Sequence, residues 1–170
     1  AADAVIHGSA VGRGGGSIST NTTVGNGALS SNTTGKRNTA DGYEALHENT
    51  AGSRNTATGY HALRENTDGD FNNAIGHISL LSTTTGDRNT AIGSHTLRDN
   101  TTGELNTASG MESLRDNTTG SNNTANGYTA LRDVTTGDNN IGIGTSAGIP
   151  GSPFQITTQS NRIVVGNDDH

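Results

Sequence analysis

A 17-residue period organises most of this chain and restricts what it can fold into. The copies follow the consensus N-T-A-x-G-Y-x-A-L-R-D-N-T-T-G-x-x, seven times in full and once in part, without an insertion or deletion. Their first residue is Asn in every copy, at Asn21, Asn38, Asn55, Asn72, Asn89, Asn106, Asn123 and Asn140. Strict phase has a physical reason in a stacked structure, because one extra residue would displace every ladder above it. The repeat therefore predicts an all-β, tandem-repeat β-solenoid or β-roll.

The repeat also divides the chain into three parts. Residues 1–20 are a Gly-rich N-terminal segment, residues 21–148 hold the repeats, and residues 149–170 follow them. Both prolines lie in the last segment, where the pattern is interrupted before it re-forms as N-R-I-V-V-G from Asn161 to Gly166. This run is rich in β-branched residues, as strands are. We expect it to cap the solenoid, with Phe154 covering the open end.

Two invariant glycines per repeat predict two corners. The fifth position is Gly25, Gly42, Gly59, Gly76, Gly93, Gly110, Gly127 and Gly144. The fifteenth is Gly35, Gly52, Gly69, Gly86, Gly103, Gly120 and Gly137. Glycine adopts a positive φ without steric cost, so both sets are expected at corners with positive φ.

A leucine at the ninth position predicts the core. It is present in all seven full repeats, as Leu29, Leu46, Leu63, Leu80, Leu97, Leu114 and Leu131. The third position is always small and is expected to face inward as well. The fourth position varies from Asp41 to Ile143 and is expected to face solvent, although the apolar last copy, N-I-G-I-G, argues for the reverse.

The apolar content is low for a self-contained core. It amounts to 28%, against roughly 45–50% in average proteins by a count that includes Gly. Three chains that share one axis of Leu and Ala would supply the missing burial. We therefore expect a homotrimeric fibre, with its chains intertwined or side by side.

The residues that carry chemistry elsewhere do not form a recognisable site in this pattern. The histidines share no single repeat position, and no two lie at the spacing of metal ligands; they are His7, His47, His61, His77, His95 and His170. Arginines beside acidic residues, as at Arg98 and Asp99, predict an exposed ladder of mixed charge. A one-column Asp-rich turn does not make a calcium β-roll, so no metal and no cofactor are expected.

Several function classes are excluded or disfavoured. The chain has no nucleophile-elbow motif and only five aromatic residues for stacking on a sugar, so we expect no enzyme. A net charge of −6 without a basic run argues against nucleic acid. No apolar stretch approaches the ~20 residues of a membrane span. The sequons at Asn21, Asn32, Asn100, Asn117 and Asn122 arise from the repeat, so they are interpreted as ladder residues.

Runs such as NTAIGSHTLRDNTTG and NTANGYTALRD resemble the repeat of bacteriophage tail-fibre proteins and related bacterial surface proteins, from Asn21 to Gly148. NRIVVGNDDH is similar to the strand that precedes their cleaved C-terminal intramolecular chaperone. The resemblance implies homotrimeric fibres of the virion or cell surface that attach to a host receptor, a glycan or an outer-membrane protein. It implies no particular contact residues; the repeat itself suggests Tyr43, Tyr60 and Tyr128, which are equally consistent with packing between coils or chains.

Two alternatives remain at this stage. The N-T-A-I-G run at Asn89 is similar to the rungs of trimeric autotransporter adhesin heads, although the period is longer than theirs. A regular Thr column suits an ice-binding solenoid, and one runs through Thr33, Thr50, Thr67, Thr84, Thr101, Thr118 and Thr135. A flat and exposed face with two Thr columns would favour ice binding. A buried or bent face would argue against it.

Overall fold

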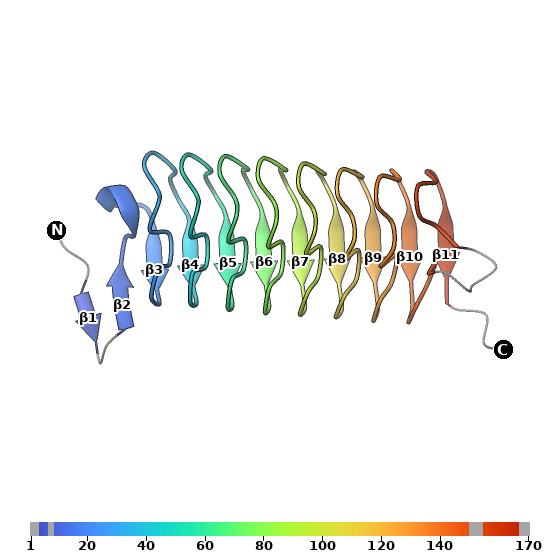
Figure 1. Cartoon of the computed structure of the whole chain (residues 1–170), viewed down its shortest axis with the longest axis horizontal. Helices are drawn as coiled ribbons and strands as arrows, with labels where there is room; N and C mark the ends of the chain where they lie inside the picture. The colour runs from blue at the N-terminus through green and yellow to red at the C-terminus, as the bar shows by residue number, and fades with distance from the viewer. Residues whose placement is uncertain (1–3, 7–8, 150–154, 167–170) are drawn as a thin grey trace.

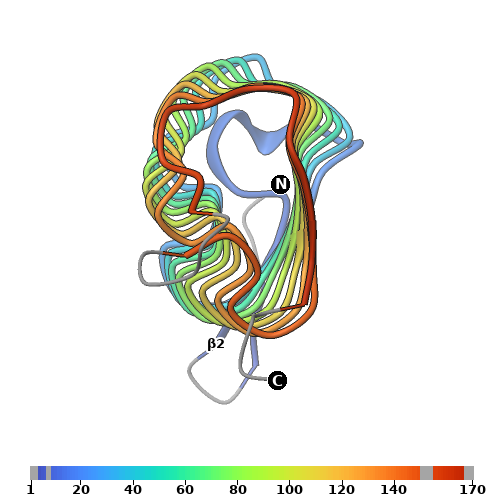
Figure 2. The same ribbon diagram turned by 90° about the vertical axis from the view of Figure 1, so that its right-hand side faces the viewer.

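The chain folds into a β-solenoid that rises by one coil per repeat (Figure 1). The computed structural model describes residues 4–6, 9–149 and 155–166. Viewed along the axis, the coils of the repeats superpose closely, as Figure 2 shows. The prediction of an all-β tandem-repeat solenoid is therefore confirmed, whereas the oligomeric state stays a prediction.

One sheet of eleven described strands runs along the solenoid in chain order. The first two strands, β1 (Ala4–Ile6) and β2 (Ser9–Gly12), form an antiparallel hairpin, and β2 pairs antiparallel with β3. From β3 onward, all neighbouring strands are parallel. They are β3 (Thr22–Val24), β4 (Thr39–Asp41), β5 (Thr56–Thr58), β6 (Asn73–Ile75), β7 (Thr90–Ile92), β8 (Thr107–Ser109), β9 (Thr124–Asn126), β10 (Ile141–Ile143) and β11 (Ile163–Val165). A short 3-10 helix, η1 (Gly15–Ser17), precedes the first coil.

Each strand alternates between the two faces of the coil. In β4, Ala40 is fully buried while Thr39 and Asp41 are exposed, as a period of two requires. The expectation that the fourth position faces solvent holds in the last copy too, because Ile143 is 46% exposed. The two Ile of that copy therefore do not reverse the orientation of the strand.

The core lies inside each coil of the single chain. All seven leucines of the ninth position are fully buried, together with the Ala residues of the third position. The inward orientation expected of both positions is thus present. The expected shared axis of Leu and Ala is wrong, however, because these side chains are already enclosed by their own chain and offer no surface to another.

The two glycine positions have different physical causes. At the fifth position φ is positive in all eight repeats, from 110° at Gly144 to 144° at Gly42. At the fifteenth position φ is not positive, so the predicted second corner of this kind is wrong. There, glycine is required by packing: a Cβ on Gly52 would meet the Asn49 amide oxygen and the carbonyl oxygen of Gly69 in the next coil.

The invariant Asn of the first position links successive coils. The side-chain amide of Asn38 donates to the Gly52 carbonyl over 2.8 Å, and its oxygen accepts from the backbone amide of Asn55 over 2.9 Å. Four of the five sequon asparagines are buried ladder residues of this kind or of the twelfth position. The interpretation as a ladder residue is wrong for Asn122, which belongs to the seventeenth position and is exposed.

Candidate functional site

The sixth position places a column of rings on the outside of the solenoid. Tyr43 and Tyr60, on successive coils, stack with ring centroids 5.4 Å apart and planes inclined by 10°. His77 continues the stack from Tyr60 at 5.4 Å and 15°. Both tyrosines are 46% exposed, so their outer edges reach solvent while their faces contact each other. We call Tyr43, Tyr60 and His77 the ring column.

Two further histidines flank the ring column from the neighbouring seventh position. His61 stacks on Tyr60 with centroids 3.8 Å apart, and His95 meets His77 edge-on at 5.1 Å. Tyr60 and His61 are adjacent in the sequence, whereas His77 and His95 are 18 residues apart and meet only because their coils stack. Burial lowers the pKa of both His61 and His95, since it disfavours a charged imidazole.

A cluster of charged side chains, Glu44, Glu48 and Arg64, lies beside the ring column. Nε of Arg64 donates to Oε2 of Glu44 over 2.8 Å, and its Nη1 donates to Glu48 over 3.0 Å. The hydrogen bond from Arg64 lowers the pKa of Glu44. The Glu44 charge in turn raises the pKa of Tyr43. Nε2 of His61 lies 3.2 Å from Oε2 of Glu44 without making a hydrogen bond.

Of the three tyrosines suggested as contacts, the structure brings together only Tyr43 and Tyr60. Tyr128 lies four coils beyond Tyr60 and is 49% exposed. Met111 precedes it in the same column and is 45% exposed. Any surface that uses all three tyrosines therefore extends along most of the solenoid.

Beyond Arg64, which pairs with Glu44 and Glu48 of the preceding coil, three pairs of the mixed charge ladder lie within single coils. Arg98 pairs with Asp99 at 2.6 Å, Arg115 with Asp116 at 2.6 Å and Arg132 with Asp133 at 3.1 Å. These side chains are about one-fifth to one-third exposed, and pairs of this kind contribute about 0–1 kcal/mol each.

Sequence reasoning missed a second aromatic feature, at the seventeenth position. Phe71 lies between two guanidinium groups, that of Arg54 at 4.9 Å and that of Arg88 at 5.6 Å from its ring centroid. Arg54, Phe71 and Arg88 are spaced by 17 residues. Because one coil has 17 residues, this spacing could have predicted that the three side chains are neighbours.

The Thr column considered for ice binding is engaged in holding the coils together. The Thr33 hydroxyl donates to the carbonyl of Thr50 over 2.9 Å, and the same bond joins Thr101 to Thr118 over 2.9 Å. The column lies in a bend and is half-buried from Thr50 onward. A second Thr column lies on the outer face of the strands at the second position, as at Thr39, Thr56 and Thr90, but Asn73 and Ile141 interrupt it. Neither column makes a flat two-column Thr face.

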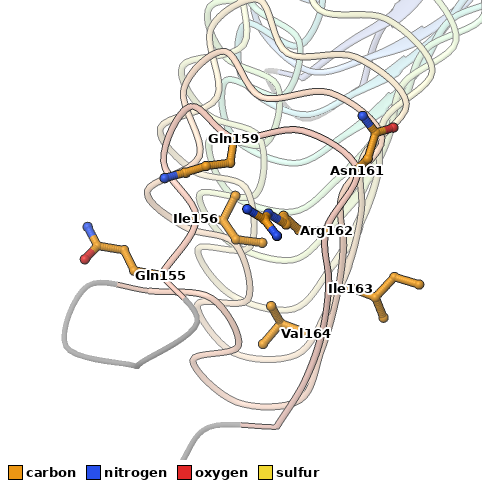
Figure 3. Close-up of a pocket in the computed structure, with 7 residues that line it drawn as sticks. All are labelled: Gln155, Ile156, Gln159, Asn161, Arg162, Ile163 and Val164. Atoms are coloured by element: carbon orange, nitrogen blue, oxygen red, sulfur yellow. The ribbon is translucent and has the colours of Figure 1, made fainter.

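The C-terminal end of the solenoid holds a cavity of about 490 Å³. Figure 3 shows Ile156, Arg162 and Val164 directed toward the inside of the last coil, whereas Ile163 points away from it. Gln155, Gln159 and Asn161 complete the lining. Phe154, expected to cover this end, lies outside the described residues, as do His7 and His170.

The described residues hold no group of three His, Asp or Glu side chains arranged to bind a metal ion. Nor does any helix within residues 4–6, 9–149 and 155–166 have the length and apolar character to cross a bilayer. No family model matches the chain, and no match was found among curated proteins or solved structures.

Proposed function

We propose that the chain is a structural and adhesive segment of an extended fibre, of the tail-fibre or surface-appendage kind, that attaches to a receptor on a cell. The observation that supports this best is the ring column, an exposed stack of Tyr43, Tyr60 and His77 on a rigid scaffold. Tyr combines contact area with a hydroxyl and loses little entropy on binding. Repetition along a fibre turns weak single contacts into avid attachment.

The fibre is proposed to be a homotrimer whose chains lie side by side. Since the leucines are enclosed, the contact would use the outer face of the strands. Three isoleucines of the fourth position, Ile75, Ile92 and Ile143, lie there with 40–46% exposure. Exposed apolar groups of this size on a sheet favour association. A bacterial adhesin head would work by the same contacts and differ in what carries the segment.

Adhesion is tested with beads coated with the purified protein and mixed with a panel of bacterial cells. We expect capture of at least one cell type, reduced in the variant Tyr43→Ser/Tyr60→Ser and retained in the control Tyr128→Ser. Capture no higher than on albumin-coated beads for every cell type would reject the proposal.

The oligomeric state is tested separately by light scattering. A particle of three times 17.3 kDa is expected for the wild type, and a folded monomer for Ile92→Asp. A wild-type monomer would reject the trimer but leave the adhesive segment to be judged by the bead assay.

A further inference from the structure

The last coil breaks the rule that the first position is Asn. The backbone amide of Arg162 donates to the Asn140 side-chain oxygen over 3.0 Å, just as the amide of Asn140 donates to Asn123 over 2.9 Å. Arg162 therefore occupies the first position of this coil. Asn161, which the sequence pattern offered as the opening residue, takes the seventeenth position, with the positive φ of 60° found there in every coil.

The substitution places a cation where eight preceding coils have a neutral amide. The side chain of Arg162 is exposed at the open end of the solenoid and turns toward the inside of the last coil, where it lines the terminal cavity (Figure 3). Arg98, Arg115 and Arg132 each pair with a carboxylate of their own coil, whereas no ion pair is found for Arg162 within residues 155–166 or the rest of the described chain. A cavity whose guanidinium forms no ion pair with the described residues is suited to an anion.

The other walls narrow the class of ligand. Ile156 and Val164 are 2% and 6% exposed and form an apolar wall. The Gln159 side-chain oxygen accepts from the backbone amides of Thr157 over 2.8 Å and Thr158 over 3.2 Å, and in Figure 3 the end of this exposed side chain points away from Arg162. The volume of about 490 Å³ lies within the usual ~300–1,000 Å³ range of small-molecule sites.

We propose that this cavity binds an acidic sugar residue of a surface polysaccharide, a uronic acid. Arg162 would hold the carboxylate through paired N–H donors. The apolar wall would contact the C–H face of the pyranose ring. The inference rests on the proposed attachment function, for which it names a ligand class and a second contact site.

The test is titration of the purified chain with D-glucuronate and D-galacturonate, followed by ligand-observed NMR. D-glucose and D-galactose serve as the uncharged matches, and acetate as a carboxylate without a ring. Binding of a uronate but of neither neutral sugar nor acetate is expected. Equal binding of acetate would show a simple anion site, and no binding of either uronate at millimolar concentration would overturn the proposal.

The matched variant is Arg162→Asn, which restores the residue of all preceding coils and so preserves the fold. We expect at least about a tenfold loss of uronate affinity, because a charge-assisted bond is removed. Arg37→Asn is the control, since Arg37 is exposed at the seventeenth position, where Asn occurs naturally at Asn122 and Asn139. Unchanged affinity in Arg162→Asn would also overturn the proposal.

The bead assay separates the two proposals. Uronate binding without capture of any cell by the wild type would leave the site standing and reject the attachment function. Capture that persists in the absence of any uronate binding would reject the site and leave attachment to the ring column.

Discussion

The side-chain amide of Asn49 donates to the side-chain oxygen of Asn32 over 2.8 Å, across one coil of the solenoid. Both residues are fully buried or nearly so, and Asn66 repeats the bond to Asn49 over 2.7 Å. This ladder of Asn side chains at the twelfth position is interrupted wherever the next coil has a residue other than Asn there. The Asn66 oxygen has no partner where Thr83 follows, and the Asn117 oxygen has none where Val134 follows.

Thr83→Asn is therefore expected to stabilise the protein. The new amide would donate to the Asn66 oxygen, and the new oxygen would accept from Asn100, whose amide now lies 3.5 Å from the Thr83 hydroxyl. An unsatisfied buried acceptor costs about 1–3 kcal/mol, so a gain on the order of 1–2 kcal/mol is expected in urea unfolding. Thr84→Asn, one residue away in the half-buried Thr column, is the control. A gain in both variants, or in neither, would contradict the ladder argument.

Gly103→Ala is expected to destabilise the solenoid strongly. A Cβ there would meet the carbonyl oxygen of Gly120 and the side-chain oxygen of Asn100 closer than van der Waals contact allows. Since the ladder holds both oxygen atoms in place, the two coils must move apart. The free energy of unfolding is therefore expected to fall by about 3 kcal/mol or more. The exposed neighbour Thr102→Ala should change stability by less than about 0.5 kcal/mol. Thermal melts of the two variants, followed by circular dichroism, measure the difference.

The repeat predicted the solenoid and its inward residues because identical side chains at a fixed period favour stacking in register. It did not predict that Leu97 and its equivalents adopt a positive φ, 50° at Leu97. Leucine rarely does so, and the enclosing coil rather than local preference imposes it. The same limit explains the glycines at the fifteenth position: sequence marks them as invariant but does not distinguish a positive φ from a close approach between coils.

The candidate sites were less accessible to sequence reasoning. Tyr43 and Tyr60 were identified by position, but the histidines share no single repeat position, and the contact of His77 with His95 forms only when their coils stack. The last coil was misaligned because its paired residues, Ile141 and Ile163, are 22 apart instead of 17. The extra residues lie between Gly148 and Asn161, where the sequence does not follow the repeat. The repeat therefore cannot predict how the last coil aligns with the one before it.

Stability is expected to fall as the pH is lowered from about 7.5 to about 5. Burial holds the pKa of His61 and His95 below the ordinary 6.5 in the folded chain, so the unfolded chain binds protons more readily. Their contribution is complete above the unfolded pKa of 6.5 and is lost as the pH falls through 6.5 toward the folded pKa. The melting temperature of His61→Gln/His95→Gln should vary less over this range than that of the wild type. An equal slope in the double variant would assign the effect to other groups. Glu44, whose pKa lies below 4.5, loses its pairing only at lower pH.

Ser94→Tyr is expected to extend the ring column by one coil. In the third coil, Tyr60 stacks on His61 at 3.8 Å; in the fifth, His95 has the same position but its neighbour is Ser94. A Tyr ring there would lie against His95 and follow His77, and a pair of stacked rings contributes about 0.5–1.5 kcal/mol. The bond between Ser94 Oγ and His95 Nδ1 is lost, so a net gain on the order of 0.5 kcal/mol is expected.

Thr145→Tyr is the matched control, because it adds the same ring to the same column where the seventh position is Ser146 and offers no imidazole. A double-mutant cycle of Ser94→Tyr with His95→Ala isolates the stacking itself. Favourable coupling between the two positions would show that a ring at the sixth position is stabilised by the imidazole that follows it in the same coil, so that the length of the ring column can be set by the sixth and seventh positions. Coupling near zero would mean that other contacts near Tyr43, Tyr60 and His77, such as the Glu44–Arg64 pair, hold these rings in place.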